Sequence, residues 1–236
     1  SPGSKAMAMS VPEWLTDVFG VLGALGFMLM LTPQVVENAR NKSTEGLSMG
    51  LILLWHLAAI LSCAFFYCSE TGLWMLLSFA AFALCCSIIE GQHVGYRHVT
   101  RKCCRKCIII AVSLLAAAFS TALVALVIVF FRAMPSARIG LGDVAPSILI
   151  GLGFFPQYYT FCRTWSIKGF SFGVTALDVM GSVANTLAIF SLPDVQVAQA
   201  AFDAAPFLVI ICFQLGLVSL ACVISCSPKR DDTDSC

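Results

Sequence analysis

Apolar runs of 18 or more residues recur along the whole chain, and they limit what it can fold into. Each is long enough to cross the roughly 30 Å hydrocarbon core of a bilayer as an α-helix. Only helices and closed β-barrels satisfy their backbone hydrogen bonds in lipid. The runs are continuous rather than alternating, which predicts helices and not barrel strands. With 59% apolar and only 11% charged residues, the chain is expected to be an all-α membrane protein.

Seven transmembrane helices are predicted, in two three-helix units joined by a linker helix (3+1+3). The spans are expected at 13–36, 47–67, 73–92, 107–131, 144–162, 170–191 and 204–225. The first unit is 13–92, the linker helix is 107–131 and the second unit is 144–225. The remaining parts are an N-terminal segment 1–12, a basic loop 93–106 and a tail 226–236.

Basic residues predict the orientation of this bundle. Of the fourteen Lys and Arg residues, only Lys5, Arg132 and Arg138 lie on the side of the N-terminus, and the other eleven lie on the opposite side. Cytosolic loops of membrane proteins carry the excess of Lys and Arg. We therefore expect a lumenal N-terminus, a cytosolic loop 93–106 and a cytosolic tail. No Lys or Arg is expected in mid-membrane, which excludes a retinal-binding protein because its Schiff base needs an embedded lysine.

An internal repeat relates the two three-helix units. Residues 33–50, PQVVENARNKSTEGLSMG, align without a gap with residues 156–173, PQYYTFCRTWSIKGFSFG, at an offset of 123 residues. Seven of eighteen aligned pairs are identical: Pro33/Pro156, Gln34/Gln157, Arg40/Arg163, Ser43/Ser166, Gly46/Gly169, Ser48/Ser171 and Gly50/Gly173. The offset covers four predicted spans, so the two units run in the same direction. Parallel repeats of this kind place a ligand site near the midplane, between the halves.

The paired Pro-Gln, the basic residue after it and the Ser-x-x-Gly-x-Ser pattern resemble the PQ-loop family of membrane transporters. That family includes the lysosomal cystine carrier (cystinosin) and vacuolar or lysosomal amino acid exporters. The resemblance implies proton-coupled export of a small polar solute, expected to be an amino acid, from an acidic organelle to the cytosol. The expected location is the lysosomal or vacuolar membrane. Protons would be the coupling ion, with no other cofactor and no metal.

Asp178 is the most informative single residue. It is the one acidic residue expected deep in a span, because four others are placed near span ends: Glu37, Glu90, Asp143 and Asp203. A carboxyl group inside the membrane marks an ion pathway or proton relay by default, although a protonated carboxyl can also bridge helices. The resemblance to the cystine carrier implies that Asp178 is the proton-coupling carboxylate. The residues that match that carrier are Ser171, Gly173, Asp178, Gly181 and Ser182. Val174 stands where that carrier has an Asn, which argues against cystine as the substrate.

The repeat aligns Trp55 with Asp178 and puts His56 at a similar depth. Histidine titrates near neutral pH, so His56 is a second candidate for proton coupling. A neutral histidine bonded inside the bundle is the equal alternative. Trp55, Asn185 and Gln214 are candidates for the substrate pathway, although polar residues in late spans can equally pin two helices together.

The two Pro-Gln pairs are candidate gating hinges. Proline removes a backbone hydrogen bond and kinks a helix, and we expect the neighbouring Gln34 and Gln157 to bond the carbonyl groups that Pro33 and Pro156 leave free. Hinge residues usually sit at element ends, which favours moving hinges over static kinks. Cys103, Cys104 and Cys107 stand beside basic residues at the membrane edge, where palmitoylation is an option and an unmodified thiol the alternative.

Two other classes of protein compete with a proton-coupled transporter. A facilitative sugar carrier like the SWEET proteins needs no titratable acid, so Asp178 counts against it. A receptor like the KDEL receptor would need a cationic side chain in the membrane. We find no constellation of an enzyme, and the expected partners are a small solute and membrane lipid, not nucleic acid. The sequence leaves the oligomeric state open.

Overall fold

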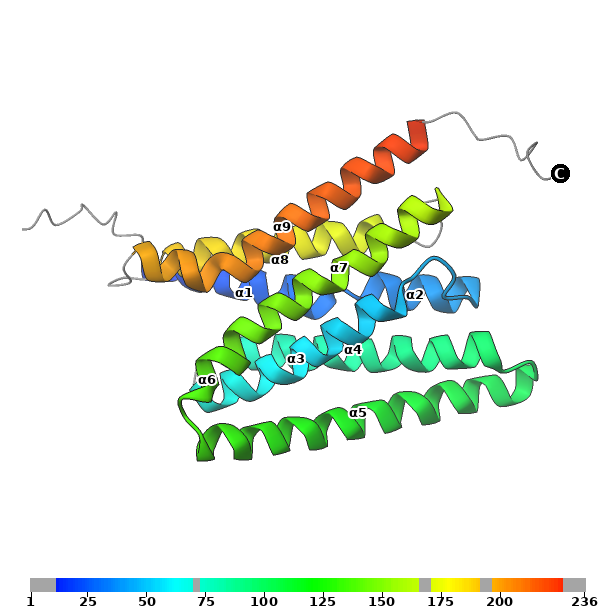
Figure 1. Ribbon diagram of the computed structural model, residues 1–236, viewed down its shortest axis with the longest axis horizontal. Coiled ribbons are helices and arrows are strands. Elements are labelled where there is room, and N and C mark those ends of the chain that lie inside the picture. Colours follow the sequence, from blue (N-terminus) through cyan, green and yellow to red (C-terminus); the bar gives the residue numbers. More distant parts are fainter. Residues whose placement is uncertain (1–11, 70–72, 166–170, 192–196, 227–236) are drawn as a thin grey trace, which may run out of the picture.

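The computed structural model describes residues 12–69, 73–165, 171–191 and 197–226, and every regular element in these ranges is helical (Figure 1). The predicted terminal segments 1–12 and 226–236 lie almost wholly outside the described residues. In chain order the elements are α1 (Glu13–Leu29), α2 (Thr32–Asn41), α3 (Met49–Ser69), α4 (Leu73–His98), α5 (Lys102–Ala133), α6 (Ala137–Ile139), the π-helical turn η1 (Gly140–Val144), α7 (Ala145–Thr164), α8 (Phe172–Phe190) and α9 (Val197–Cys226).

The predicted all-α membrane fold of two three-helix repeats and a linker helix is confirmed. Six helical segments in the described residues are long and apolar enough to cross a membrane: Trp14–Asn41, Met49–Ser69, Met75–His98, Cys104–Ala133, Phe172–Phe190 and Ala204–Cys226. α7 is 20 residues long but more polar, since it carries Gln157, Tyr158 and Tyr159 in its second half. It is still the seventh helix of the bundle, because it packs against α3 and α9.

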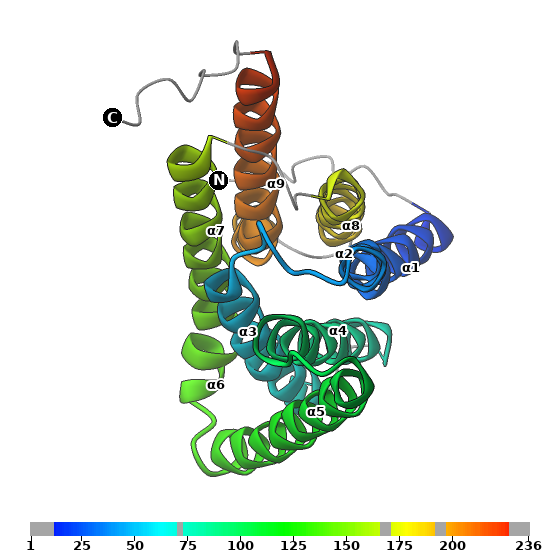
Figure 2. The same cartoon turned by 90° about the vertical axis from the view of Figure 1, so that its right-hand side faces the viewer.

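The third helix lies in the middle of each repeat. α4 packs against both α1 and α3, and α9 packs against both α7 and α8. Between the repeats, the first helix of each packs on the second helix of the other, since α1 packs on α8 and α7 packs on α3. The linker α5 lies beside α3 and α4, at the edge of the molecule (Figure 2). This arrangement places the second helix of each repeat, which carries Trp55 or Asp178, at the contact between the repeats.

The two repeats differ at their prolines. In the first, α1 ends at Leu29 and α2 begins at Thr32, so Pro33 stands in the first turn of a new helix, where its missing N–H costs little. In the second, Pro156 lies inside α7, which continues to Thr164. The helices nevertheless end alike. Lys42 and Trp165, which the alignment pairs, are both left-handed and donate their N–H to the carbonyl four residues back.

The basic connection between the first repeat and the linker is shorter than predicted. The sequence suggests a loop over 93–106, but α4 continues to His98 and α5 begins at Lys102. Arg105 closes the turn between them, because its Nε and Nη2 donate to the Val99 carbonyl at 3.1 and 2.9 Å. The apolar run ends before the helix does, since the last turns of α4 carry polar residues that still pack on α5.

Glycines bring α1 and α8 close together. A Cβ added at Gly26 would lie 2.7 Å from the Gly181 Cα, and one added at Gly23 would lie 2.3 Å from the Asn185 Oδ1. A Cβ at Gly20 would meet nothing within 4 Å. Close backbone approach at small residues is a common way of packing membrane helices. The contact fixes the first helix of one repeat on the second helix of the other.

Candidate functional site

Asp178 lies at the junction of the two repeats, with its carboxyl group held from one side. Its side chain is buried, with only 1% of the residue exposed. Gln214 of α9 donates its Nε2 hydrogen to Asp178 Oδ2, and Thr175 Oγ1 donates to Gln214 Oε1 at 3.1 Å. The other carboxyl oxygen, Oδ1, is buried without a hydrogen-bond partner. An unpaired buried oxygen is costly, so this site is suited to accept a proton or another hydrogen-bond donor.

Trp55 faces Asp178 across a small cavity of about 10 Å³, which both residues line. The indole Nε1 of Trp55 donates to the Ile150 carbonyl of α7 at 3.3 Å, so α3 of the first repeat is tied to α7 of the second. Trp55 also packs edge-on against Phe154, at 5.2 Å between ring centroids. The alignment of Trp55 with Asp178 therefore matches a real juxtaposition, in which equivalent positions of the repeats border the same space.

The prolines of the repeated motif contact the glycines of the opposite repeat. A Cβ at Gly50 would lie 3.3 Å from the Pro156 Cγ, and a Cβ at Gly173 would lie 3.2 Å from the Pro33 Cβ. Contacts this close leave little room for any side chain but hydrogen. Each Pro-Gln segment is therefore packed against the start of the second helix in the other repeat.

The two glutamines do not bond the carbonyl groups that the prolines leave free, and they do not behave alike. Gln157 crosses to the first repeat, where its Oε1 accepts from the Ser48 N–H and its Nε2 donates to the Gly46 carbonyl, both at 3.3 Å. Gln34 instead donates to Asn38 Oδ1 at 2.9 Å within α2. The expectation that both glutamines repair their own helices is wrong, because in this packing the connection 42–48 lies within reach of Gln157.

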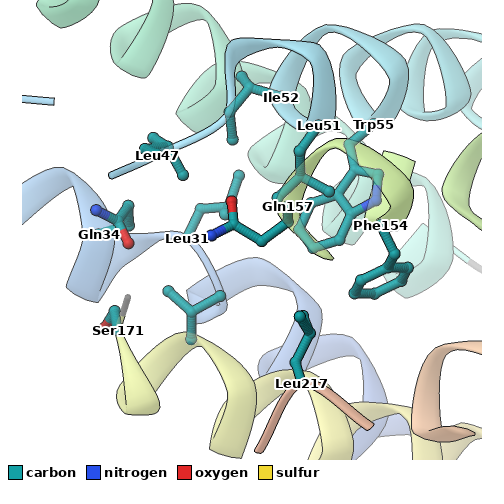
Figure 3. Close-up of a pocket in the computed structure, with 11 residues that line it drawn as sticks. Leu31, Gln34, Leu47, Leu51, Ile52, Trp55, Phe154, Gln157, Ser171 and Leu217 are labelled. Atoms are coloured by element: carbon teal, nitrogen blue, oxygen red, sulfur yellow. The ribbon is translucent and has the colours of Figure 1, made fainter. Parts of the chain in front are cut away.

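A narrow cavity separates the two Pro-Gln pairs. Gln34 and Gln157 line it from different repeats, together with Ser171 and Trp55, and its volume is about 40 Å³ (Figure 3). A buried water needs roughly 10–15 Å³, so the space accommodates a few waters but no solute of amino acid size. We call this part of the molecule the Pro-Gln end. Leu47 borders both this narrow cavity and a surface pocket of about 370 Å³ between the connection 42–48 and the end of α4.

A larger cavity of about 330 Å³ lies toward the opposite end, where α1 begins and α8 finishes. Thr16 Oγ1 donates to the Ser191 carbonyl at that end, at 3.3 Å. The cavity shares four lining residues with the small cavity that contains Asp178: Phe27, Phe79, Ile150 and Ile210. Adjoining cavities thus lead from this end to Asp178, and Trp55 borders both the small cavity at Asp178 and the narrow cavity at the Pro-Gln end.

His56 is turned away from this central path. Its Nδ1 lies 2.7 Å from Glu90 Oε1 of α4, and its Nε2 lies 2.8 Å from Ser120 Oγ of the linker α5. Ser120 Oγ also lies 2.8 Å from the Ala116 carbonyl oxygen, so it joins His56 to the backbone of α5. The structure therefore does not bring His56 to Asp178. The placement of Glu90 near a span end is wrong too, because α4 runs on for eight more residues.

Of the other two residues predicted to line the substrate pathway, Gln214 lies at the Asp178 site and Asn185 lies in a helix contact. Asn185 is 1% exposed and lies against Gly23 at the contact of α1 and α8, and its Oδ1 has no hydrogen-bond partner. It lines none of the cavities described here. Asp203 and Cys103 have side chains outside the described part of the chain, whereas Cys104 and Cys107 are exposed at the start of α5.

One polar cluster was not predicted from the sequence. Asn38 Nδ2 donates to Gln92 Oε1 at 3.1 Å, and Gln92 Nε2 donates to the Val35 carbonyl at 3.0 Å. These bonds join α2 to α4 just after the helix break. An amide at the polar end of α4 is the only signal in the sequence, and it does not indicate a partner 54 residues away.

The repeated geometry agrees with comparisons to known proteins. The PQ loop repeat family matches residues 15–75 and 145–196, which cover α1 from its third residue through α3, and α7 with α8. The chain therefore contains two PQ-loop repeats. Among curated proteins it is similar to "Uncharacterized protein C2E12.03c" of Schizosaccharomyces pombe, with 27% identity over 182 residues. That match covers 74% of this chain and 62% of the relative, so the chain spans less than two thirds of the relative's length.

The two PQ-loop repeats, together with six apolar helices in the described part of the chain, identify a multi-pass membrane protein. PQ-loop proteins are generally transporters or receptors rather than enzymes. The two repeats therefore suggest a membrane transporter or a related membrane protein.

Proposed function

We propose that this PQ-loop protein is a proton-coupled transporter that moves a small solute from an acidic organelle, such as a lysosome or vacuole, to the cytosol. The observation that carries the proposal is the Asp178 site. A buried carboxyl group with one oxygen held by Gln214 and the other unpaired lies where the two repeats meet. Ionisable groups inside a membrane face pathways and mark proton relays.

The cavities support an alternating-access mechanism around this carboxyl group. The large cavity adjoins the small cavity at Asp178 from the end where α1 begins, while Gln157 and the two proline–glycine contacts hold the repeats together around the narrow cavity at the Pro-Gln end. A proton and a solute entering from the open end would reach Asp178 first. Separation of the repeats at the Pro-Gln end, with closure of the large cavity, would then expose them to the other side.

The direction of transport rests on the distribution of basic residues. Eleven of the fourteen Lys and Arg residues belong to the Pro-Gln end or to segments on its side of the membrane. The excess of positive charge favours the cytosol. The large cavity then faces the lumen, where an acidic pH loads the proton and the neutral cytosol removes it.

Reconstituted vesicles test the proposal. Asp178→Asn keeps the size of the side chain and can still bond Gln214, but it cannot titrate. We expect it to abolish solute uptake driven by a pH gradient, together with solute-linked proton movement. Asp17→Asn is the matched control, because Asp17 is an exposed carboxylate in the first turns of α1. Full gradient-driven transport by Asp178→Asn would overturn the proton-coupling role of Asp178, whereas solute uptake by the unsubstituted protein that does not respond to a pH gradient would favour an uncoupled carrier.

A further inference from the structure

The large cavity is walled by aromatic rings. Its volume of about 330 Å³ is at the lower end of the range for small-molecule sites. The rings of Phe27 and Phe79 lie 6.0 Å apart at their centroids, Phe27 and Phe207 5.8 Å, and Phe66 and Phe79 5.2 Å. The wall therefore comes from both repeats, through α1, α3, α4 and α9. Such a surface accepts the apolar body of a ligand, and the ring faces also attract cations.

The inner limit of this space carries a single charged group. Phe27, Phe79, Ile150 and Ile210 border both the large cavity and the small one that Asp178 lines. Asp178 lines only the small cavity, and its Oδ1 is buried without a partner, although Oδ2 is already bonded by Gln214. A ligand that fills the aromatic space and extends into the small cavity, which must widen to admit it, can satisfy this oxygen with an N–H group. An ammonium group fits best, because a hydrogen bond between charged groups is about twice as strong as a neutral one.

The described residues that line the two cavities include no Lys, Arg or His. Their polar members besides Asp178 are Ser62 and Ser147. A ligand carboxylate would enter this space without a cation to compensate for its lost hydration, which is expensive in an apolar environment. Asp178 would repel it as well. The same chemistry that favours an amine thus disfavours a zwitterionic amino acid.

We propose that the solute is an organic amine with an aromatic or branched apolar body and without a carboxylate, whose body fills the aromatic cavity and whose ammonium group bonds Asp178 Oδ1. The proposal rests on the transport function proposed above, with Asp178 as its coupling site, and names its substrate class. Because a proton and an ammonium group compete for the same Asp178 oxygen, they occupy it in turn, and the amine binds while the carboxyl group is ionised. It departs from the amino acid that the family resemblance implies, because the lining of this chain offers a partner for only one of an amino acid's two charges.

Four compounds with the same phenyl ring test this assignment on the intact protein in lipid nanodiscs. Phenethylamine carries the amine alone, phenylalanine adds a carboxylate, 3-phenylpropionate has only the carboxylate, and 2-phenylethanol has no charge. We expect calorimetry to show phenethylamine binding at least about tenfold more tightly than each of the others, the worth of one charge-assisted hydrogen bond. Equal or tighter binding of phenylalanine or 2-phenylethanol overturns the proposal.

Variants locate the binding to the two parts of the site. Asp178→Asn should weaken phenethylamine binding by about tenfold or more and leave 2-phenylethanol unchanged. Phe79→Leu keeps an apolar wall but removes a ring face, and it should weaken phenethylamine by roughly three- to tenfold. Phe119→Leu is the control, since Phe119 is 66% exposed on the linker α5. An equal effect of Phe79→Leu and Phe119→Leu would place the amine elsewhere and refute the site.

The experiments distinguish a failure of the proposed substrate class from a failure of the proposed transport function. If a pH gradient drives uptake of an amino acid or a sugar while phenethylamine does not bind, the substrate class is wrong and the transporter stands. If phenethylamine binds through Asp178 while no solute crosses the membrane in response to a gradient, the binding site stands and the proposed transport function is wrong.

Discussion

Gln157 offers a direct test of how the Pro-Gln end is closed. Its side chain makes two hydrogen bonds to the first repeat, to the Ser48 N–H and the Gly46 carbonyl. Both are 3.3 Å long, so we assign each the lower part of the usual range, about 0.5–1 kcal/mol. Gln157→Ala removes both and should favour local opening by about 1–2 kcal/mol, which raises the opening constant roughly 5- to 30-fold.

Hydrogen exchange of the Ser48 amide measures this opening. In the unsubstituted protein the amide is bonded to Gln157 Oε1, and in Gln157→Ala it loses that partner. We expect its exchange rate to rise by the same 5- to 30-fold, by mass spectrometry of the peptide that contains residues 44–52. The same variant should also transport at an altered rate, because one end of the molecule no longer closes as tightly.

Gln34→Ala is a matched control, since the repeat alignment places Gln34 and Gln157 at equivalent positions. The Gln34 amide bonds only to Asn38 in the same helix among the contacts observed for it, so its loss should leave Ser48 exchange within about twofold of the original rate. The reasoning is refuted if the two variants raise Ser48 exchange equally, or if Gln157→Ala leaves it unchanged.

Three further predictions concern the hinges, the helix packing and the orientation. Pro33→Ala and Pro156→Ala should each slow transport by about tenfold or more with little loss of expression, and unchanged rates would leave the prolines as static packing. Gly26→Ala should lower the free energy of unfolding by about 1–3 kcal/mol through overpacking, whereas Gly20→Ala should not; equal thermal melts would contradict the close contact. Asn41 should carry no glycan in cells, because the predicted orientation places it on the cytosolic side, and a glycan there would show that the predicted orientation is inverted.

Much of the architecture was predictable because two features of the sequence, the apolar runs and the duplicated Pro-Gln motif, both indicate it. The length of an apolar run is set by the thickness of a bilayer, so the spans are visible without an alignment. The duplicated Pro-Gln motif then fixes which helices are equivalent. Together they aligned Trp55 with Asp178, but that the two residues border one cavity was learned only from the structure.

The errors share one cause, which is that polar residues at the ends of helices find partners only in three dimensions. Glu90 lies beyond the middle of α4, where the apolar run weakens, so the sequence suggests a span end although the helix continues. The partner of His56 was therefore missed. Gln157 was assigned to its own helix because the alignment cannot show that α3 packs on α7. These contacts are made in the tertiary structure, and neither propensity nor span length encodes them.

The two repeats have the same motif but different helix boundaries around it. A turn at Met30 and Leu31 divides α1 from α2, although both residues keep right-handed helical backbone angles, whereas α7 is unbroken through Pro156. Gln157 of α7 bonds the connection 42–48, which follows α2 in the first repeat. Opening of the Pro-Gln end must therefore break a contact between α7 and the first repeat, while Asp178 lies on α8, away from the segment that this contact releases.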